Sequence, residues 1–304
     1  MISLIRFFEE EKYLNDFLDG HLYMNSIGHF WSLGQPHPQD DLFEGVFETM
    51  SSVDLDKRYG SDLTGAFGSH ILLPVMNRLD GYQFVHILCF YMHEYDLQLQ
   101  QVTRIPESIK GLGKYAVRIK DVQTFVDLLF EKIKNEGLYG LMGPITYRKP
   151  DEEIEYMDCF DKNITHQDEH EWRFALIPDF EKSKQEAAEL RRMNAAKAQA
   201  EIPSTYDQHI YFEVGDLRKL AEVVDADALI SEPSNVYGCG YKTVDRLPYK
   251  WEDRKKLLED WQQKGLLIPY QAYPEQYVGW YPRKAFRDKV MEIDNGVKPL
   301  LTIG

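Results

Sequence analysis

The sequence predicts an α+β fold in one domain, with mixed or antiparallel sheets and flanking helices. Hydrophobic residues make up 43% of the 304 residues and aromatic residues 13%, which is ample for a core. Strand-like and helix-like segments follow one another without the regular alternation of a doubly wound parallel sheet. We expect a single domain over residues 1–304, with an exposed helical insertion at 181–202 and an α/β portion at 203–304 packed on the core.

The first residues predict a strand, a short helix and a second strand. The apolar run at residues 2–8 is typical of a strand that carries one charge, Arg6. Residues 9–20 have apolar side chains at helical spacing, acidic residues in the first turn and Gly20 at the end, all of which helices favour. Residues 21–30 predict a strand that leads into a turn, and a loop rich in Gly, Pro and Asp follows.

The middle of the chain supplies most of the predicted sheet. The run "YQFVHILCFYM", residues 82–92, is the most strand-like and is apolar on both faces, which indicates a central strand. A helix is expected over residues 121–137, where Asp121 has the side chain of an N-cap. Further strands are predicted at residues 113–120, 140–149 and 171–177.

The segment at residues 181–202 has a different composition from the rest of the chain. It is rich in Ala, Glu, Lys and Arg and has few large apolar side chains, so its helix propensity is high but it has little to bury. We therefore expect a protruding helix and a candidate contact surface for a protein partner. After it we predict a strand at residues 209–215 and helices at residues 216–224 and 249–265.

The charge and cysteine content limit the partners and the compartment. The chain has 50 acidic and 35 basic residues, a net charge of -15, which argues against broad binding to nucleic acids and leaves a basic protein partner open. Its three cysteines form no CxxC pair, which favours a reducing cytoplasm. The first residues lack the pattern of a signal peptide, and no apolar run approaches the ~18 residues of a membrane span. We expect a soluble cytoplasmic protein that does not bind membranes.

Two groups of residues carry side chains that could bind a metal ion. His86, Cys89 and His93 have the spacing H-x2-C-x3-H, but a strand would place His86 and Cys89 on opposite faces, so buried core residues are the preferred interpretation. The acidic residues Asp40, Asp41 and Glu44 would suit a metal-dependent nuclease, but the chain lacks the PD-(D/E)xK pattern. We predict no metal site.

The stretch "HEWRF", residues 170–174, raises the question of a functional cleft. Strand alternation would place His170, Trp172 and Phe174 on one face, and the charged residues between them on the other. The two charged residues would then form a solvated ion pair or line a cleft. Arg6, Ser26 and Glu171 each interrupt an apolar strand, and buried polar groups are costly unless they meet one another or a ligand. Separate edge or ion-pair residues remain the alternative.

Four segments together resemble known proteins: "GHLYMNSIGHF", "DDLFEG", "HILCFY" and "FDKNITHQDEHEWRF". They resemble a broad family of uncharacterised bacterial and phage proteins of unknown function, with the likeness spread thinly over residues 1–230. More distantly, the layout is similar to the ADP-ribosyltransferase fold. That resemblance implies a core split into two small sheets, with NAD bound between them as a substrate.

The resemblance also implies roles for particular residues. Glu171, within "EHE", and Ser26 would be catalytic, while Arg6, Asn25 and Arg173 would bind NAD. The implied function is that of an NAD-consuming ADP-ribosyltransferase-like enzyme, a toxin or phage-defence effector, that modifies an unknown macromolecular acceptor. The alternatives are a non-enzymatic protein-interaction module, which would bind through the predicted protruding helix, and a metal-dependent nuclease.

Overall fold

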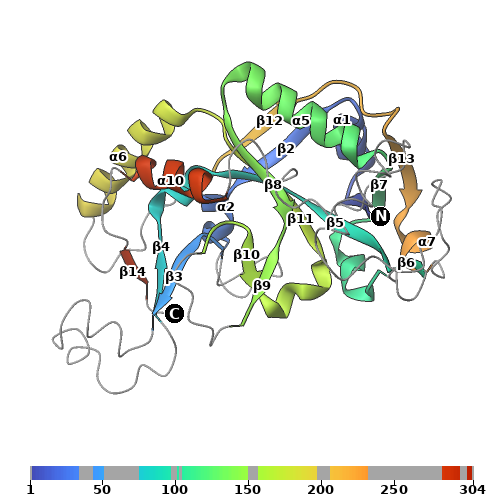
Figure 1. Cartoon of the computed structure of the whole chain (residues 1–304), viewed down its shortest axis with the longest axis horizontal. Coiled ribbons are helices and arrows are strands. Elements are labelled where there is room, and N and C mark those ends of the chain that lie inside the picture. The colour runs from blue at the N-terminus through green and yellow to red at the C-terminus, as the bar shows by residue number, and fades with distance from the viewer. Residues whose placement is uncertain are drawn as a thin grey trace, which may run out of the picture.

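A mostly antiparallel sheet of nine strands forms the centre of the protein, seen here in a computed structural model (Figure 1). The structure describes residues 2–33, 44–50, 75–96, 101–102, 105–149, 157–196, 206–231, 283–294 and 300–302. This architecture confirms the α+β class. No helix in these ranges is long and apolar enough to cross a membrane.

The main sheet contains β1 (Ile2–Phe8), β2 (His21–Ser26), β5 (His86–Asp96), β6 (Gln101–Val102), β7 (Tyr115–Ile119), β8 (Tyr139–Pro144), β11 (Glu171–Ile177), β12 (His209–Glu213) and β13 (Ala221–Asp225). Two smaller sheets pair β9 (Thr146–Arg148) with β10 (Asp161–Asn163), and β4 (Val75–Arg78) with β3 (Val46–Met50) and β14 (Leu300–Thr302). The helices are α1 (Glu11–Leu18), α2 (Ile27–Ser32), α5 (Val122–Glu136), α6 (Phe180–Ala196), α7 (Ala226–Ser231) and α10 (Arg283–Ile293), with 3-10 helices η1 (Asp80–Phe84), η2 (Glu107–Leu112) and η3 (Ile164–Glu169).

The long strand β5 is central, as predicted, and one of its edges is shared by two strands that are separated by a gap. One edge of β5 pairs with β11, while the other edge pairs with two different strands. β2 pairs with β5 at His86 and Ile87, and β1 pairs with it from Tyr91 onward. Between these points, residues 88–90 of β5 have no described strand beside them on that edge. We call this opening between β1 and β2 the fork.

The two faces of the sheet differ in character. On one face, Phe90, Trp172 and Phe174 join a core cluster with apolar residues of α1 and α5, two helices that lie together in Figure 1. Trp172 and Phe174, predicted to share a face, are fully buried. Glu171 and Arg173 alternate with them on β11 and therefore face the other side of the sheet. They are also buried, so the interpretation of a solvated ion pair is wrong.

Several local predictions need correction. His170 lies outside the strand, since it has a φ of 39° and ends η3. The helix predicted at residues 216–224 is wrong, because β13 begins at Ala221 and pairs with β7. The β-branched pair Val223 and Val224 suits that strand, and this preference outweighs the helical spacing. After β2 the chain forms the short helix α2 in place of a simple turn.

The helix predicted from residue 181 is present as α6, but it is not a free arm. Ala187 is only 2% exposed, and Phe180 and Leu190 pack against the second core cluster. The small alanine lets this side of the helix approach its neighbours closely. Met193, in contrast, is 56% exposed, so the opposite side faces solvent. The last residues of the predicted insertion, and the helix predicted at 249–265, lie outside the described residues.

Candidate functional site

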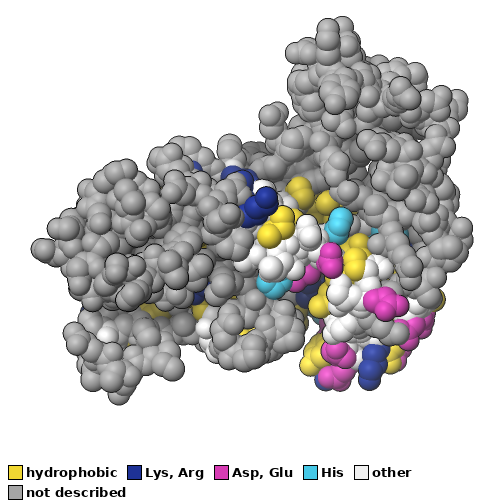
Figure 2. Space-filling view, turned by 90° about the horizontal axis from the view of Figure 1, so that it is seen from below, with side chains coloured by type: hydrophobic (Ala, Val, Ile, Leu, Met, Phe, Trp, Pro, Cys, Tyr) yellow, Lys and Arg dark blue, Asp and Glu magenta, His cyan; other side chains and the backbone are white. Residues whose placement is uncertain are grey.

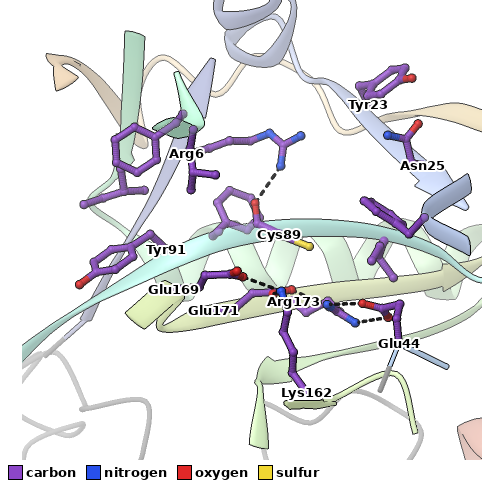
Figure 3. Close-up of a pocket in the computed structure, with 16 residues that line it drawn as sticks. Arg6, Tyr23, Asn25, Glu44, Cys89, Tyr91, Lys162, Glu169, Glu171 and Arg173 are labelled. Carbon is purple, nitrogen blue, oxygen red and sulfur yellow. Dashed lines mark hydrogen bonds and ion pairs between the residues drawn. The ribbon is translucent and has the colours of Figure 1, made fainter. Parts of the chain in front are cut away.

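A pocket of about 280 Å³ lies at the fork, lined mainly by the sheet face opposite α1 and α5. Figure 3 shows Arg6, Tyr23 and Asn25 toward one edge of β5, with Glu169, Glu171 and Arg173 toward the other. Its apolar wall consists of Ile5, Phe7, Phe30, Ile87, Phe90, Tyr91 and Leu112. From below, the described surface is hollowed, with acidic, basic and histidine side chains near the hollow (Figure 2).

Arg6 supplies the positive charge at the fork. Its Nη1 donates a hydrogen bond to the Cys89 carbonyl oxygen at 2.8 Å, at the part of β5 where no described strand pairs on that edge. Its guanidinium also lies 5.7 Å from the centre of the Phe8 ring. Burial lowers the pKa of Arg6, although an arginine remains charged. No carboxylate of the described residues forms an ion pair with it, so this charge is available to a ligand.

Arg173 holds two carboxylates on the other side of β5. Its Nε donates to Glu171 Oε1 at 2.6 Å, and its two terminal nitrogens donate to Glu44 at 2.8 and 3.1 Å. It also donates to the Cys159 carbonyl oxygen. Arg173 is 1% exposed and lines the pocket. Most of its donors are therefore occupied by protein groups, which makes it a support for the carboxylates.

Lys162, from β10, joins the two acidic residues of "EHE". Its Nζ contacts Glu171 Oε2 at 3.1 Å and also Glu169 Oε2. Glu169 is the outermost carboxylate, with a side chain that is 28% exposed, and it contacts His166 Nδ1 at 2.9 Å. We refer to Glu44, Lys162, Glu169, Glu171 and Arg173 as the pocket cluster.

The pocket cluster carries excess negative charge. Its three carboxylates exceed its two cations by one, which gives a net charge of −1 when these groups are ionised. Burial raises the pKa of Glu171, but the charges of Arg173 and Lys162 outweigh burial and hold that pKa well below its usual range. Burial lowers the pKa of Lys162, but the charges of Glu171 and Glu169 outweigh burial and raise that pKa. Glu171 and Lys162 are therefore both ionised at neutral pH.

The structure brings four of the five predicted site residues to the pocket: Arg6, Asn25, Glu171 and Arg173. Ser26 does not line it. The buried Ser26 hydroxyl donates to the Tyr206 carbonyl at 2.7 Å and accepts from the backbone N–H of His29 and of Gln208, both at 3.2 Å. Its observed contacts cap α2 and hold it against the segment before β12.

Sequence reasoning did not assign Lys162 a role and considered Glu44 only as a metal ligand. Neither has a local signal, because their partners lie 9 and 129 residues away along the chain. Both oxygens of Glu44 are bound by Arg173. Within the described ranges no three His, Cys, Asp or Glu residues form a group that could hold a metal ion, and Asp40 and Asp41 lie outside those ranges.

Comparison with known proteins adds no assignment. No protein-family model matches the chain, and neither curated proteins nor solved structures give a significant match.

Proposed function

We propose that the chain is an NAD-consuming ADP-ribosyltransferase-like enzyme whose substrate binds at the fork. The observation that supports this is the separation of charge within one pocket. Arg6 provides a cation without a carboxylate partner among the described residues, and the pocket cluster provides an excess carboxylate. Arg6 stands on β1 and Glu171 on β11, the strands on either side of β5, and two strand spacings correspond to ~10 Å.

This separation of a cation from a carboxylate suits the reacting half of NAD, which has the pyrophosphate at one end and the nicotinamide ribose at the other. An arginine binds pyrophosphate oxygens through strong, charge-assisted hydrogen bonds. Cleavage of the nicotinamide glycosidic bond develops positive charge on the ribose, and a fixed carboxylate stabilises that charge. Glu171 is already ionised and held in place by Arg173 and Lys162, so it would not need to reorganise during the reaction.

The size and walls of the pocket are consistent with this substrate. A volume of about 280 Å³ is near the lower end of the ~300–1,000 Å³ typical of ligand pockets. It would hold the nicotinamide and its ribose, with the adenosine half extending past Arg6. Phe7, Phe30 and Tyr91 offer aromatic rings to the nicotinamide. In this proposal the fork corresponds to the division between the two sheets of the ADP-ribosyltransferase fold.

Nicotinamide release from NAD by the purified chain tests the proposal. We expect release above the rate of a protein-free blank, together with a rise in melting temperature that grows with NAD concentration. Arg6→Gln should abolish that rise at moderate NAD concentration, because it removes the pyrophosphate contact. The exposed Arg218, whose ion pairs with Asp19 and Asp216 lie outside the pocket, provides the control substitution Arg218→Gln. If the wild-type chain shows no nicotinamide release and no thermal shift with NAD, the proposal is wrong.

A further inference from the structure

A patch of exposed aromatic rings continues from the pocket across two strands. Tyr23 lines the pocket, and β12 places Tyr211 directly opposite it in the sheet. Cross-strand partners share a face, and the two ring centres are 5.5 Å apart. Tyr23 is 38% and Tyr211 51% exposed, and the ring of the exposed His209 lies 5.1 Å from that of Tyr23. The rim of the pocket therefore continues into an exposed aromatic surface.

Two carboxylates belong to the same two-stranded surface. Glu213 ends β12, and Asp207 lies just before that strand; each side chain is 56% exposed. Glu213 lies 3.2 Å from His21, while Asp207 lies 2.7 Å from His29 and accepts from the Ser32 hydroxyl at 3.4 Å. Because more than half of each side chain is exposed, both carboxylates remain accessible to a partner. We define the aromatic–acidic patch as Tyr23, Asp207, His209, Tyr211 and Glu213.

We propose that this patch docks an arginine-containing peptide segment of a partner protein. A guanidinium is planar, stacks on tyrosine rings and donates to carboxylates, so it matches both features of the patch. A nucleic acid could also stack its bases there, but its phosphates would meet carboxylates, and the patch contains no Lys or Arg. The net charge of -15 likewise favours a basic partner.

The position of the patch suggests what docking would achieve. A peptide bound across Tyr23 would have neighbouring side chains at the pocket, beside Asn25 and the reacting end of the proposed substrate. This use of the patch, as the acceptor site, rests on the proposed function. Docking itself does not, since it requires neither NAD nor turnover.

Fluorescence anisotropy with labelled peptides tests docking directly. The first peptide alternates Gly and Arg, and the second replaces each Arg by citrulline, which keeps the shape and removes the charge. We expect the Arg peptide to bind and the citrulline peptide to bind at least tenfold more weakly. Loss of a tyrosine ring from an exposed cation–π contact should weaken binding about two- to fivefold, so the double variant Tyr23→Ala/Tyr211→Ala should show a larger loss than either single variant.

Matched variants decide whether the patch is responsible. The double variant Tyr23→Phe/Tyr211→Phe keeps both rings and should bind nearly as well as wild type. Tyr115→Ala removes a tyrosine of similar exposure, 37%, from β7 and should change nothing. Equal binding of the two peptides, unchanged binding by the alanine double variant, or tighter binding of a single-stranded oligonucleotide would each overturn the proposal. Peptide binding by a chain that releases no nicotinamide would uphold docking and remove only the proposed function.

Discussion

Two groups of charged residues share the segment at residues 158–162 and differ in their balance of positive and negative charge. The pocket cluster has one more carboxylate than it has cations. The second group, which we call the clasp, consists of Arg148, Asp158, Asp161 and Arg283, with two cations and two carboxylates. Arg283 Nη2 lies 2.6 Å from oxygens of both aspartates, and Arg148 Nε lies 3.0 Å from Asp161. No clasp residue lines the pocket.

This difference separates a structural use of buried charge from a candidate chemical one. Buried charges are tolerated when they are paired, and the four described residues of the clasp carry two charges of each sign. The clasp binds the first residue of α10 to the segment before β11. The pocket cluster is unbalanced and faces a cavity, so a cationic group of a ligand can complete it. The two groups meet at residues 158–162. Lys162 belongs to the pocket cluster and the Cys159 carbonyl accepts from Arg173, while Asp158 and Asp161 bind Arg283.

The largest expected effect comes from Glu171→Gln. If the carboxylate stabilises positive charge on the ribose, nicotinamide release should fall by ~10²-fold or more, which corresponds to ~2.7–4 kcal/mol at the transition state. Because Glu171 is 4% exposed and bound to two cations, its loss should also lower the free energy of unfolding by ~3–5 kcal/mol. Turnover and denaturant unfolding should be measured on the same preparation.

A carboxylate outside the pocket supplies the control for that result. Glu222, on β13, pairs with Arg118 at 2.9 Å. Glu222→Gln is therefore the same chemical change at an ion pair away from the pocket. It should leave nicotinamide release within twofold of wild type. A similar loss of turnover in both variants would show that the effect on Glu171 arises from weakened folding.

The clasp should respond to substitution in stability alone. Asp161 is 1% exposed and contacts both arginines, so Asp161→Asn should lower the free energy of unfolding by ~3 kcal/mol. Turnover per folded molecule should change by less than tenfold, since Lys162 stays anchored by Glu169 and Glu171. A loss of turnover as large as that of Glu171→Gln would mean that the two groups act as one unit.

Much of this comparison could not have been predicted from the sequence. The alternation in "EWRFALI" indicated that Glu171 and Arg173 share a face, and the polar interruption at Arg6 was visible in the first strand. The fork was not visible, because it depends on β1 and β2 meeting the same edge of β5, which is at least 60 residues away along the chain. Periodicity reports only contacts between near neighbours in sequence.

Ser26 and Lys162 show the same limit at the level of single side chains. Both are polar residues in short strands, but only Ser26 was assigned a catalytic role from the sequence. The structure uses the Ser26 hydroxyl to cap α2 and brings Lys162 to two carboxylates of the pocket. A hydroxyl at the end of a strand commonly caps the next helix, and this local signal was present in the chain.

The other end of α10 should show a pH dependence. Asp294 is 4% exposed, and burial raises its pKa to about 7. Its unfolded pKa is ~3.9, so between these values the folded state holds a proton that the unfolded state releases. Stability from this group is therefore present at low pH and is lost as the pH rises toward 7.

Asp294→Asn should remove that dependence. The variant should gain stability relative to wild type between pH 5 and pH 8, by at least ~1.4 kcal/mol, the value of one pKa unit. Urea unfolding of both proteins at the two pH values measures the difference. A variant that is equally destabilised at both values would show that the carboxylate is needed in its charged form. Because Asp294 does not line the pocket, nicotinamide release per folded molecule should be unaffected.

The smallest expected effect is that of Arg6→Lys, which keeps the charge at the fork and changes only its shape. A lysine ammonium lacks the planar set of donors that, in the proposed complex, would bind the Cys89 carbonyl and a pyrophosphate oxygen together. We expect the KM for NAD to rise about tenfold, equivalent to ~1.4 kcal/mol, with kcat within threefold of wild type. The opposite pattern, with kcat reduced and KM unchanged, would place Arg6 at the reacting ribose and reverse the orientation of the substrate in the pocket. The same measurement on Arg218→Lys, an exposed arginine whose observed ion pairs lie outside the pocket, should give wild-type values for both constants. The positive end of the pocket would then be assigned to binding, and the negative end, at Glu171, to catalysis.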